Sequence, residues 1–227
     1  IDSVKLDEKG EFSFEQPSPE YPEFYSLRLR SQAINFAIDS TEDITVKASA
    51  PTFATEYSIS GAESAVKIRE VTLNQYELSN TLYILRTELN NKQITENTYL
   101  AKLTEAIDKY KDTAENIIKS DYISMAAYYT LFQKVNDYLI FDPYEKKDRR
   151  LFQTVATIWK QQREGEPRTE HLEKFTLQVI SEARSIEKQN QILDSLGNKA
   201  TTIEANDFYN ITLPDLKNTT LNLYDLK

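Results

Sequence analysis

The stretch that decides the fold is residues 57–89, YSISGAESAVKIREVTLNQYELSNTLYILRTEL, because its hydrophobic period changes at Gly61. Before Gly61, apolar residues alternate with polar ones, which is the pattern of a half-buried strand. After Gly61, apolar residues recur every three or four positions, which indicates an amphipathic helix of about seven turns. This apolar stripe consists of Ile68, Val71, Leu78, Leu82, Leu85 and Leu89. Strands followed by helices predict an α+β fold.

The residues before Gly61 predict an N-terminal antiparallel β-sheet or small sandwich of about six short strands. Residues 25–30 alternate strictly, which places Tyr25, Leu27 and Leu29 on one face. We expect a hairpin from residues 3–6 and 11–14, because the polar loop between these runs ends in a glycine. The remaining short runs are residues 33–38, 44–47 and 57–59.

The residues after the first helix predict four more helices, which makes a five-helix region. Polar residues 90–92 end the first helix, and Thr95 is expected to cap the second. The third runs from near Ser124 to Val135, the fourth from before Leu151 to Trp159, and the fifth from a cap at Thr169 to Gly197.

These patterns divide the chain into three expected parts. The first is an antiparallel β domain at residues 1–61, and the second is a helical region at 62–200, packed on or beside the first. The third is a C-terminal β-hairpin within residues 201–227, from strand-like runs at 207–216 and 219–227. A terminal hairpin is marginal by itself, so we expect it to open a further domain beyond Lys227.

The composition excludes several function classes. The chain has 227 residues, 27 Lys and Arg, 36 Asp and Glu, a net charge of −9 and no cysteine. Disulfides, thiolate nucleophiles and cysteine-ligated metals are therefore excluded. The acidic balance argues against nucleic acid as a partner. No apolar run approaches the roughly 20 residues that cross a bilayer, so the chain is not expected to be transmembrane.

Motifs that carry chemistry are few. Only four glycines occur, too far apart for a phosphate-binding loop, and the single histidine, His171, cannot form a triad or a multi-histidine metal site. The acids Glu42, Asp43 and Glu145 lack a pattern that marks a buried pair, and the basic run 146–150 is typical of a solvated helix face. We therefore predict no catalytic residue, no cofactor and no metal ligand.

Aromatic residues are densest between Tyr122 and Trp159. At helical spacing they usually form a core, but aromatics with polar groups also favour interfaces and sugar-stacking platforms. The alternative to a core is thus a surface that docks another domain, a glycan or a peptide. The candidate interaction surface comprises Tyr128, Tyr129, Phe132, Tyr144 and Trp159.

The tail resembles a known family. Residues 207–216, DFYNITLPDL, and 219–227, TTLNLYDLK, resemble the opening hairpin of thioredoxin-like proteins of the envelope-anchored thiol–disulfide oxidoreductase type. In that family the next strand leads to a Cys-x-x-Cys motif, which has no counterpart here. Segments that resemble the N-terminal domain attached to such thioredoxins in Bacteroidetes are residues 2–14, 22–29, 37–46, 126–133 and 138–144.

The resemblance implies a non-catalytic accessory domain that positions the redox module or presents substrate to it. Its partners would be its own thioredoxin-like domain and a protein substrate, in the periplasm or at the outer membrane, with a lipid anchor in the parent protein. The alternative is a glycan- or peptide-binding module of a cell-envelope lipoprotein that uses the aromatic surface. A carboxylate-based hydrolase would need two acids facing each other in one pocket.

A homodimer is also an open alternative. The family's first strands usually lie before the position of Ile1, and a sheet edge left open by such a strand could pair with a second copy.

Overall fold

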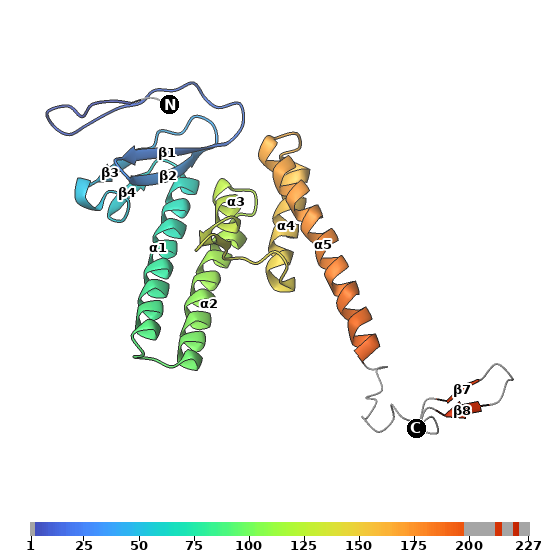
Figure 1. Cartoon of the computed structure of the whole chain (residues 1–227). Coiled ribbons are helices and arrows are strands. Elements are labelled where there is room, and N and C mark those ends of the chain that lie inside the picture. Colours follow the sequence, from blue (N-terminus) through green and yellow to red (C-terminus); the bar gives the residue numbers. More distant parts are fainter. Residues whose placement is uncertain (1–2, 198–211, 215–219, 223–227) are drawn as a thin grey trace. The chain divides into compact units, whose positions relative to one another are not determined.

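The computed structural model describes residues 3–197, 212–214 and 220–222, and confirms the α+β class (Figure 1). The chain divides into two units, Ile1–Val179 and Ile180–Lys227. The predicted three-part domain division stays a prediction. In chain order the elements are β1 (Glu23–Leu29), β2 (Gln32–Ile38), β3 (Thr45–Ala48), the 3-10 helix η1 (Ala50–Thr52), β4 (Tyr57–Ser60), α1 (Glu63–Asn90), α2 (Glu96–Ser120), α3 (Met125–Leu131), β5 (Lys134–Val135), β6 (Tyr138–Leu139), α4 (Lys146–Gln162), α5 (Pro167–Gly197), β7 (Thr212–Pro214) and β8 (Thr220–Asn222).

The N-terminal strands form two separate antiparallel pairs, β1–β2 and β3–β4. In the first pair Leu27 lies opposite Ile34, and Leu27 and Leu29 pack against the apolar cluster that contains buried Ile34, as the alternation predicts. In the second pair Tyr57 and Ile59 are buried, while Ser58 and Ser60, which alternate with them, are exposed. Both pairs thus turn one apolar face inward, although they do not merge into one sheet.

The predicted hairpin at residues 3–14 is wrong, because no strand forms there. Only its turn is present: the Gly10 N–H donates to the Asp7 carbonyl oxygen at 3.0 Å, and the Asp7 carboxylate accepts from the N–H groups of Lys9 and Glu11. Val4 and Leu6 are exposed on this segment. A two-stranded hairpin with no buried face is marginal in water, which explains why four strands precede Gly61 instead of about six.

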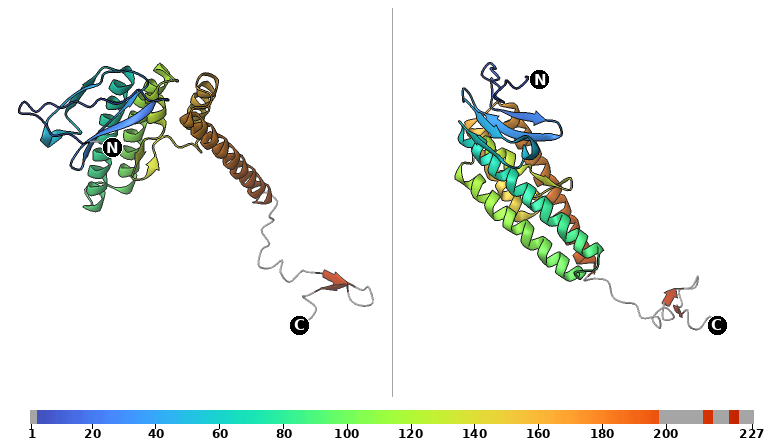
Figure 2. Two further views of the ribbon diagram at one scale, coloured as in Figure 1. Left: turned by 90° about the horizontal axis from the view of Figure 1, so that it is seen from above. Right: turned by 90° about the vertical axis from the view of Figure 1, so that its left-hand side faces the viewer.

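Helices α1 and α2 confirm the predicted periodicity, and Figures 1 and 2 show them side by side. The α1 stripe is buried at five of its six positions, Ile68, Val71, Leu78, Leu82 and Leu85. The predicted cap of α2 is also present, since Thr95 Oγ1 accepts from the Thr98 N–H at 3.2 Å. Tyr110, Ala114 and Ile117 of α2 join the same apolar cluster.

The third predicted helix is too long, because α3 ends at Leu131 and Val135 lies in strand β5. Asn136 and Asp137 have φ angles of 49° and 67°. Two successive residues with positive φ make the tight turn that joins β5 to β6 in a two-residue hairpin. The Asn-Asp dipeptide was the sequence signal for this turn.

The predicted cap of the fifth helix is also wrong. Helix α5 begins at Pro167, so Thr169 lies inside its first turn. Proline suits the first helical position, because its φ is preset and its missing N–H would have no partner inside the helix. The hydroxyl of Thr169 is buried and has no hydrogen-bond partner among the described residues.

The main core gathers side chains from all five helices. Its fully buried members include Trp159, Phe141, Phe152, Ile118 and Met125. A smaller cluster lies between the strand pairs and the start of α1, and consists of Ile34, Phe53, Tyr57, Ile59 and Ala65. Figure 1 accordingly shows the strands at the N-terminal end of α1.

Gly61 is required where β4 turns into α1. Its φ is +108°, and a Cβ atom at this position would lie 1.8 Å from the Asp43 carbonyl oxygen. We expect Gly61→Ala to lower the free energy of unfolding by roughly 2 kcal/mol, from backbone strain and the displacement of Asp43. Urea unfolding followed by circular dichroism measures this loss.

Gly165→Ala is the matched control, since Gly165 has a φ of +82° and no atom lies within 4 Å of its added Cβ. It carries the strain of positive φ without the collision. Equal losses in the two variants would contradict the role assigned to the close approach of Asp43.

Candidate functional site

The five residues of the candidate interaction surface do not lie on one exposed face. Trp159 and Tyr128 are 0% and 8% exposed, and their rings stack at 5.2 Å inside the core. Tyr129 and Phe132 are partly buried against that core, and Tyr144 alone is largely exposed, at 45%. Tyr128, Tyr129, Phe132 and Trp159 therefore point toward the core, so the core alternative describes these four and a docking platform does not.

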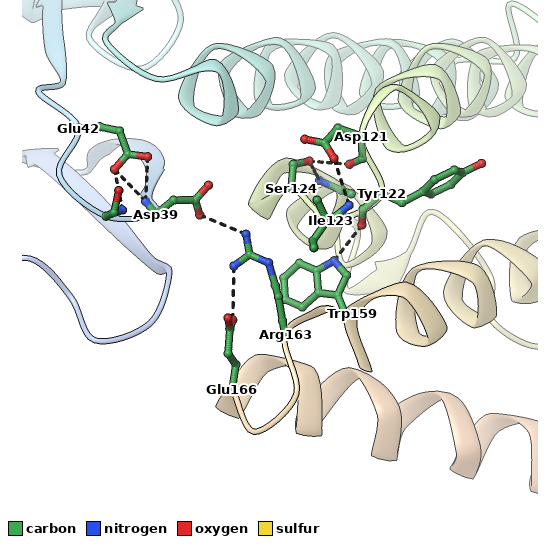
Figure 3. Close-up of polar contacts among 11 residues, drawn as sticks. Asp39, Glu42, Asp121, Tyr122, Ile123, Ser124, Trp159, Arg163 and Glu166 are labelled. Carbon is green, nitrogen blue, oxygen red and sulfur yellow. Dashed lines mark hydrogen bonds and ion pairs between the residues drawn. The ribbon is translucent and has the colours of Figure 1, made fainter. Parts of the chain in front are cut away.

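A polar cluster at the end of α4 joins segments that are distant in the sequence (Figure 3). The Arg163 guanidinium lies 3.8 Å from the Asp39 carboxylate and 3.4 Å from that of Glu166. It also lies over the Trp159 ring, 5.2 Å from the centroid. We call Asp39, Trp159, Arg163 and Glu166 the Arg163 junction.

Trp159 extends this junction to a third segment. Its indole N–H donates to the Tyr122 carbonyl oxygen at 2.8 Å, in the loop between α2 and α3 (Figure 3). Ser124 then starts α3, where its Oγ accepts from the Ala127 N–H at 3.1 Å. The junction therefore connects the loop after β2, the α2–α3 loop and the α4–α5 loop through one buried indole.

Glu42 shapes the loop that carries Asp39. Its carboxylate accepts from the backbone N–H of Ser40 at 2.7 Å and from that of Asp39 at 3.1 Å. Burial alone would raise the pKa of Glu42, but these backbone donors lower it. Glu42 thus has a structural role in holding the turn.

Arg168 makes a second connection between strand β1 and the helices. It forms an ion pair with Glu23, and its guanidinium lies over the rings of Phe24 and Tyr128, at 4.6 and 5.8 Å from their centroids. Burial lowers the pKa of Arg168. His171, one turn further along α5, is exposed, and its Nδ1 lies 2.9 Å from the Tyr128 hydroxyl.

A shallow hollow lies beside these contacts, lined by residues 19–23 and 166–168. Its volume is about 190 Å³, below the roughly 300–1,000 Å³ of typical small-molecule pockets. Glu20, Glu23 and Glu166 line it together with Arg168. Residues 3–197, 212–214 and 220–222 contain no group of three acids or histidines placed to hold a metal ion. These contacts anchor strands to helices, and we find no nucleophile–base pair among the side chains around this hollow.

Asp148 is buried although the sequence predicts it to be exposed. It interrupts the basic run 146–150, which is typical of a solvated helix face, yet it is 3% exposed. Its Oδ2 lies 2.5 Å from Lys111 Nζ and accepts from the Asp142 N–H at 2.8 Å. The signal was an acid in the first turn of a helix, directly after the Asp142-Pro143 break.

Comparisons of the chain with known protein families, curated proteins and solved structures gave no significant match. Among the helices of the described residues, none has the length and apolar character needed to cross a membrane. The fold and the Arg163 junction together define the class of protein: an α+β module in which polar contacts join the strands to the helices.

Asp39 gives the junction a pH dependence. Burial raises the pKa of its carboxyl, and the neighbouring Arg163 opposes this only in part. The folded chain therefore binds this proton more tightly than the unfolded chain, so Asp39 favours folding at low pH and loses that contribution as pH rises through its folded-state pKa. We expect Asp39→Asn to become more stable relative to wild type as pH rises from about 4 to 7.

Urea unfolding of both proteins across that pH range measures the difference. Parallel curves of unfolding free energy against pH would contradict the burial of a charged Asp39.

Proposed function

We propose that this chain is a non-catalytic accessory domain of an envelope thioredoxin-like thiol–disulfide oxidoreductase, which positions the redox module or presents substrate to it. The observation that carries the proposal lies in the tail. Residues 212–214 and 220–222 pair as an antiparallel hairpin, with Leu213 opposite Leu221, inside the segment whose sequence resembles the opening hairpin of that family.

The polar connections of the first unit support a positioning role. The Arg163 junction and the Glu23–Arg168 pair hold the strands against α4 and α5, through charges that are half-buried except for the exposed Glu23. Such contacts specify one arrangement of the elements, as a platform for a second module requires. The sequence contains no cysteine, so the thiolate of the exchange reaction would come from the redox module.

The proposal includes the setting that the resemblance implies. The partners are a thioredoxin-like domain of the same protein and a protein substrate, and the place is the periplasm or the outer membrane, with a lipid anchor on the parent. The glycan- or peptide-binding alternative receives less support, because Tyr128 and Trp159 of its aromatic surface are buried.

The first test is to read the gene beyond the codon for Lys227. We expect a Gly-Lys pair, an apolar strand and then Cys-x-x-Cys. A stop codon at that point, or a following domain without paired cysteines, would overturn the proposal.

The second test is enzymatic. Insulin reduction in the presence of dithiothreitol should be absent for this chain and present for the whole protein. Thiol-reductase activity of the chain by itself would contradict a non-catalytic role.

A further inference from the structure

One edge of strand β1 is open within the described residues, because β1 pairs with β2 alone in a sheet of two strands. Leu29 and Gln32 flank the two-residue turn between the strands and lie opposite each other. Such a pair exchanges both hydrogen bonds, and bonding then alternates along the strand. The backbone N–H and C=O groups of Phe24, Ser26 and Arg28 therefore point away from β2. Ser26 and Arg28 are exposed.

Most of the backbone groups on this edge have no partner in the described part of the chain. The Phe24 N–H donates to the Glu23 carboxylate at 2.9 Å. Ser26 and Arg28 make no backbone hydrogen bond to a described residue outside the β1–β2 pair. An open edge is a template for a further strand, and a sheet of two strands is marginal by itself. A strand added here would extend the sheet.

Charges are sorted along β1, with bases at its C-terminal end and acids at its N-terminal end. Arg28 and Arg30 are exposed, and neither forms an ion pair with a described residue. At the other end lies the hollow described above, which is lined by Glu20, Glu23 and Glu166. The strand thus presents opposite charges at its two ends.

The N-terminal end is acidic although part of its charge is neutralised. Glu23 and Glu166 each have an arginine partner, whereas Glu20 has no cationic partner in the part of the chain that the structure describes. The charge of Glu20 raises the pKa of the Tyr21 hydroxyl, and the charges of Glu166 and Glu170 add to this shift. These acids therefore make the potential around Tyr21 negative.

We propose that β1 pairs antiparallel with β1 of a second copy of this chain, with Ser26 opposite Ser26 of the second copy. In this register the Ser26 N–H and C=O groups of the two copies bond reciprocally, and the Arg28 N–H donates to the Phe24 carbonyl oxygen of the second copy. The ladder ends before Pro22, which has no N–H to donate. The two strand pairs then form one continuous sheet across a two-fold axis.

Charge complementarity selects the second copy as the occupant of this edge. In the antiparallel register Arg30 lies opposite Pro22 of the second copy, beside the acidic end that carries Glu20, and the two-fold axis repeats this contact. A parallel pair would instead place arginines beside arginines. An unrelated peptide would need the reverse order of charges along its length, which β1 itself provides. The inference does not rest on the proposed function.

Sedimentation velocity of this chain over a range of concentrations tests the proposal. We expect a monomer–dimer equilibrium with a dissociation constant of roughly 100 μM, because a single strand pair buries little surface. Salt should weaken it. Ser26→Pro removes an outward N–H and no β1–β2 hydrogen bond, so it should weaken dimerisation at least about tenfold. Circular dichroism verifies that the variant keeps its fold.

Charge reversal tests the register. Arg28→Glu with Arg30→Glu, and separately Glu20→Lys, should each weaken self-association, because each brings like charges together. A mixture of these two variants should form a heterodimer, since the reversed charges then face each other. The matched control is Arg86→Glu with Arg150→Glu, which makes the same change in net charge at exposed arginines outside β1. It should dimerise as wild type does.

A chain that stays monomeric up to about 1 mM would overturn the proposal. A dimer that persists unchanged in Ser26→Pro and in the Arg28 and Arg30 double variant would also overturn it. Equal weakening by the Arg86 and Arg150 control has the same consequence, since net charge rather than the ends of β1 would then govern association.

Discussion

Asp148→Ala is expected to lower the free energy of unfolding by about 3 kcal/mol, because it leaves a half-buried lysine without its counter-ion. The Asp148 side chain is 4% exposed and that of Lys111 is 19% exposed. Asp148 also accepts from the Asp142 N–H, so its loss removes a hydrogen bond from the turn before α4. In thermal unfolding the midpoint should fall by roughly 10 °C.

Two variants test the assigned cause. Asp112→Ala removes an exposed acid of α2, and should change stability by less than about 0.5 kcal/mol. Adding Lys111→Met to Asp148→Ala should recover most of the loss, since no unpaired charge then remains. A loss in Asp148→Ala no larger than that in Asp112→Ala would contradict a buried ion pair.

The parts of the fold that sequence predicted are those set by local periodicity. The stripe from Ile68 to Leu85 is buried as the 3.6-residue period requires, and Thr95 caps α2 through a hydrogen bond three residues away. Both features depend on neighbours within one or two helical turns. Such signals are contained in the segment itself, and need no knowledge of its surroundings.

Prediction failed where a short segment depends on its surroundings or on one backbone angle. Residues 3–14 alternate like strands, but no other element covers their apolar face. Val135 continues a helical spacing, but positive φ at Asn136 and Asp137 starts a hairpin instead. Thr169 resembles a cap, but Pro167 starts the helix earlier. At Asn136–Asp137 and at Pro167 a competing local rule of turn or proline geometry prevails over the pattern, whereas residues 3–14 lack a covering element.

The site could be predicted least, because its contacts join residues far apart in the chain. Nothing in the sequence near Asp39 indicates that Arg163 faces it, or that Lys111 faces Asp148. Aromatic density between Tyr122 and Trp159 marked the right region, but composition alone does not distinguish a core from a docking surface. The burial of the aromatic side chains distinguishes a core from a docking surface, and assigns Trp159 to the core.

Trp159→Ala is expected to be the most destabilising substitution, with a loss of about 4 kcal/mol. The side chain is 0% exposed and packs on Tyr128 at 5.2 Å. Its removal opens a cavity in the main core, and leaves the Tyr122 carbonyl oxygen and the Arg163 guanidinium without their indole contacts. Because Trp159 is the only tryptophan, unfolding of the variant must be followed by circular dichroism.

Trp159→Phe separates the volume of the indole from its hydrogen bond. Phenylalanine keeps an aromatic ring under Arg163 but cannot donate to Tyr122, so we expect a loss of about 2 kcal/mol. Limited proteolysis gives a second readout, since a weakened junction should expose the loop of residues 39–43 to cleavage before the helices unfold. If the two variants lose equal stability and the loop stays resistant, Trp159 fills space without joining the three loops.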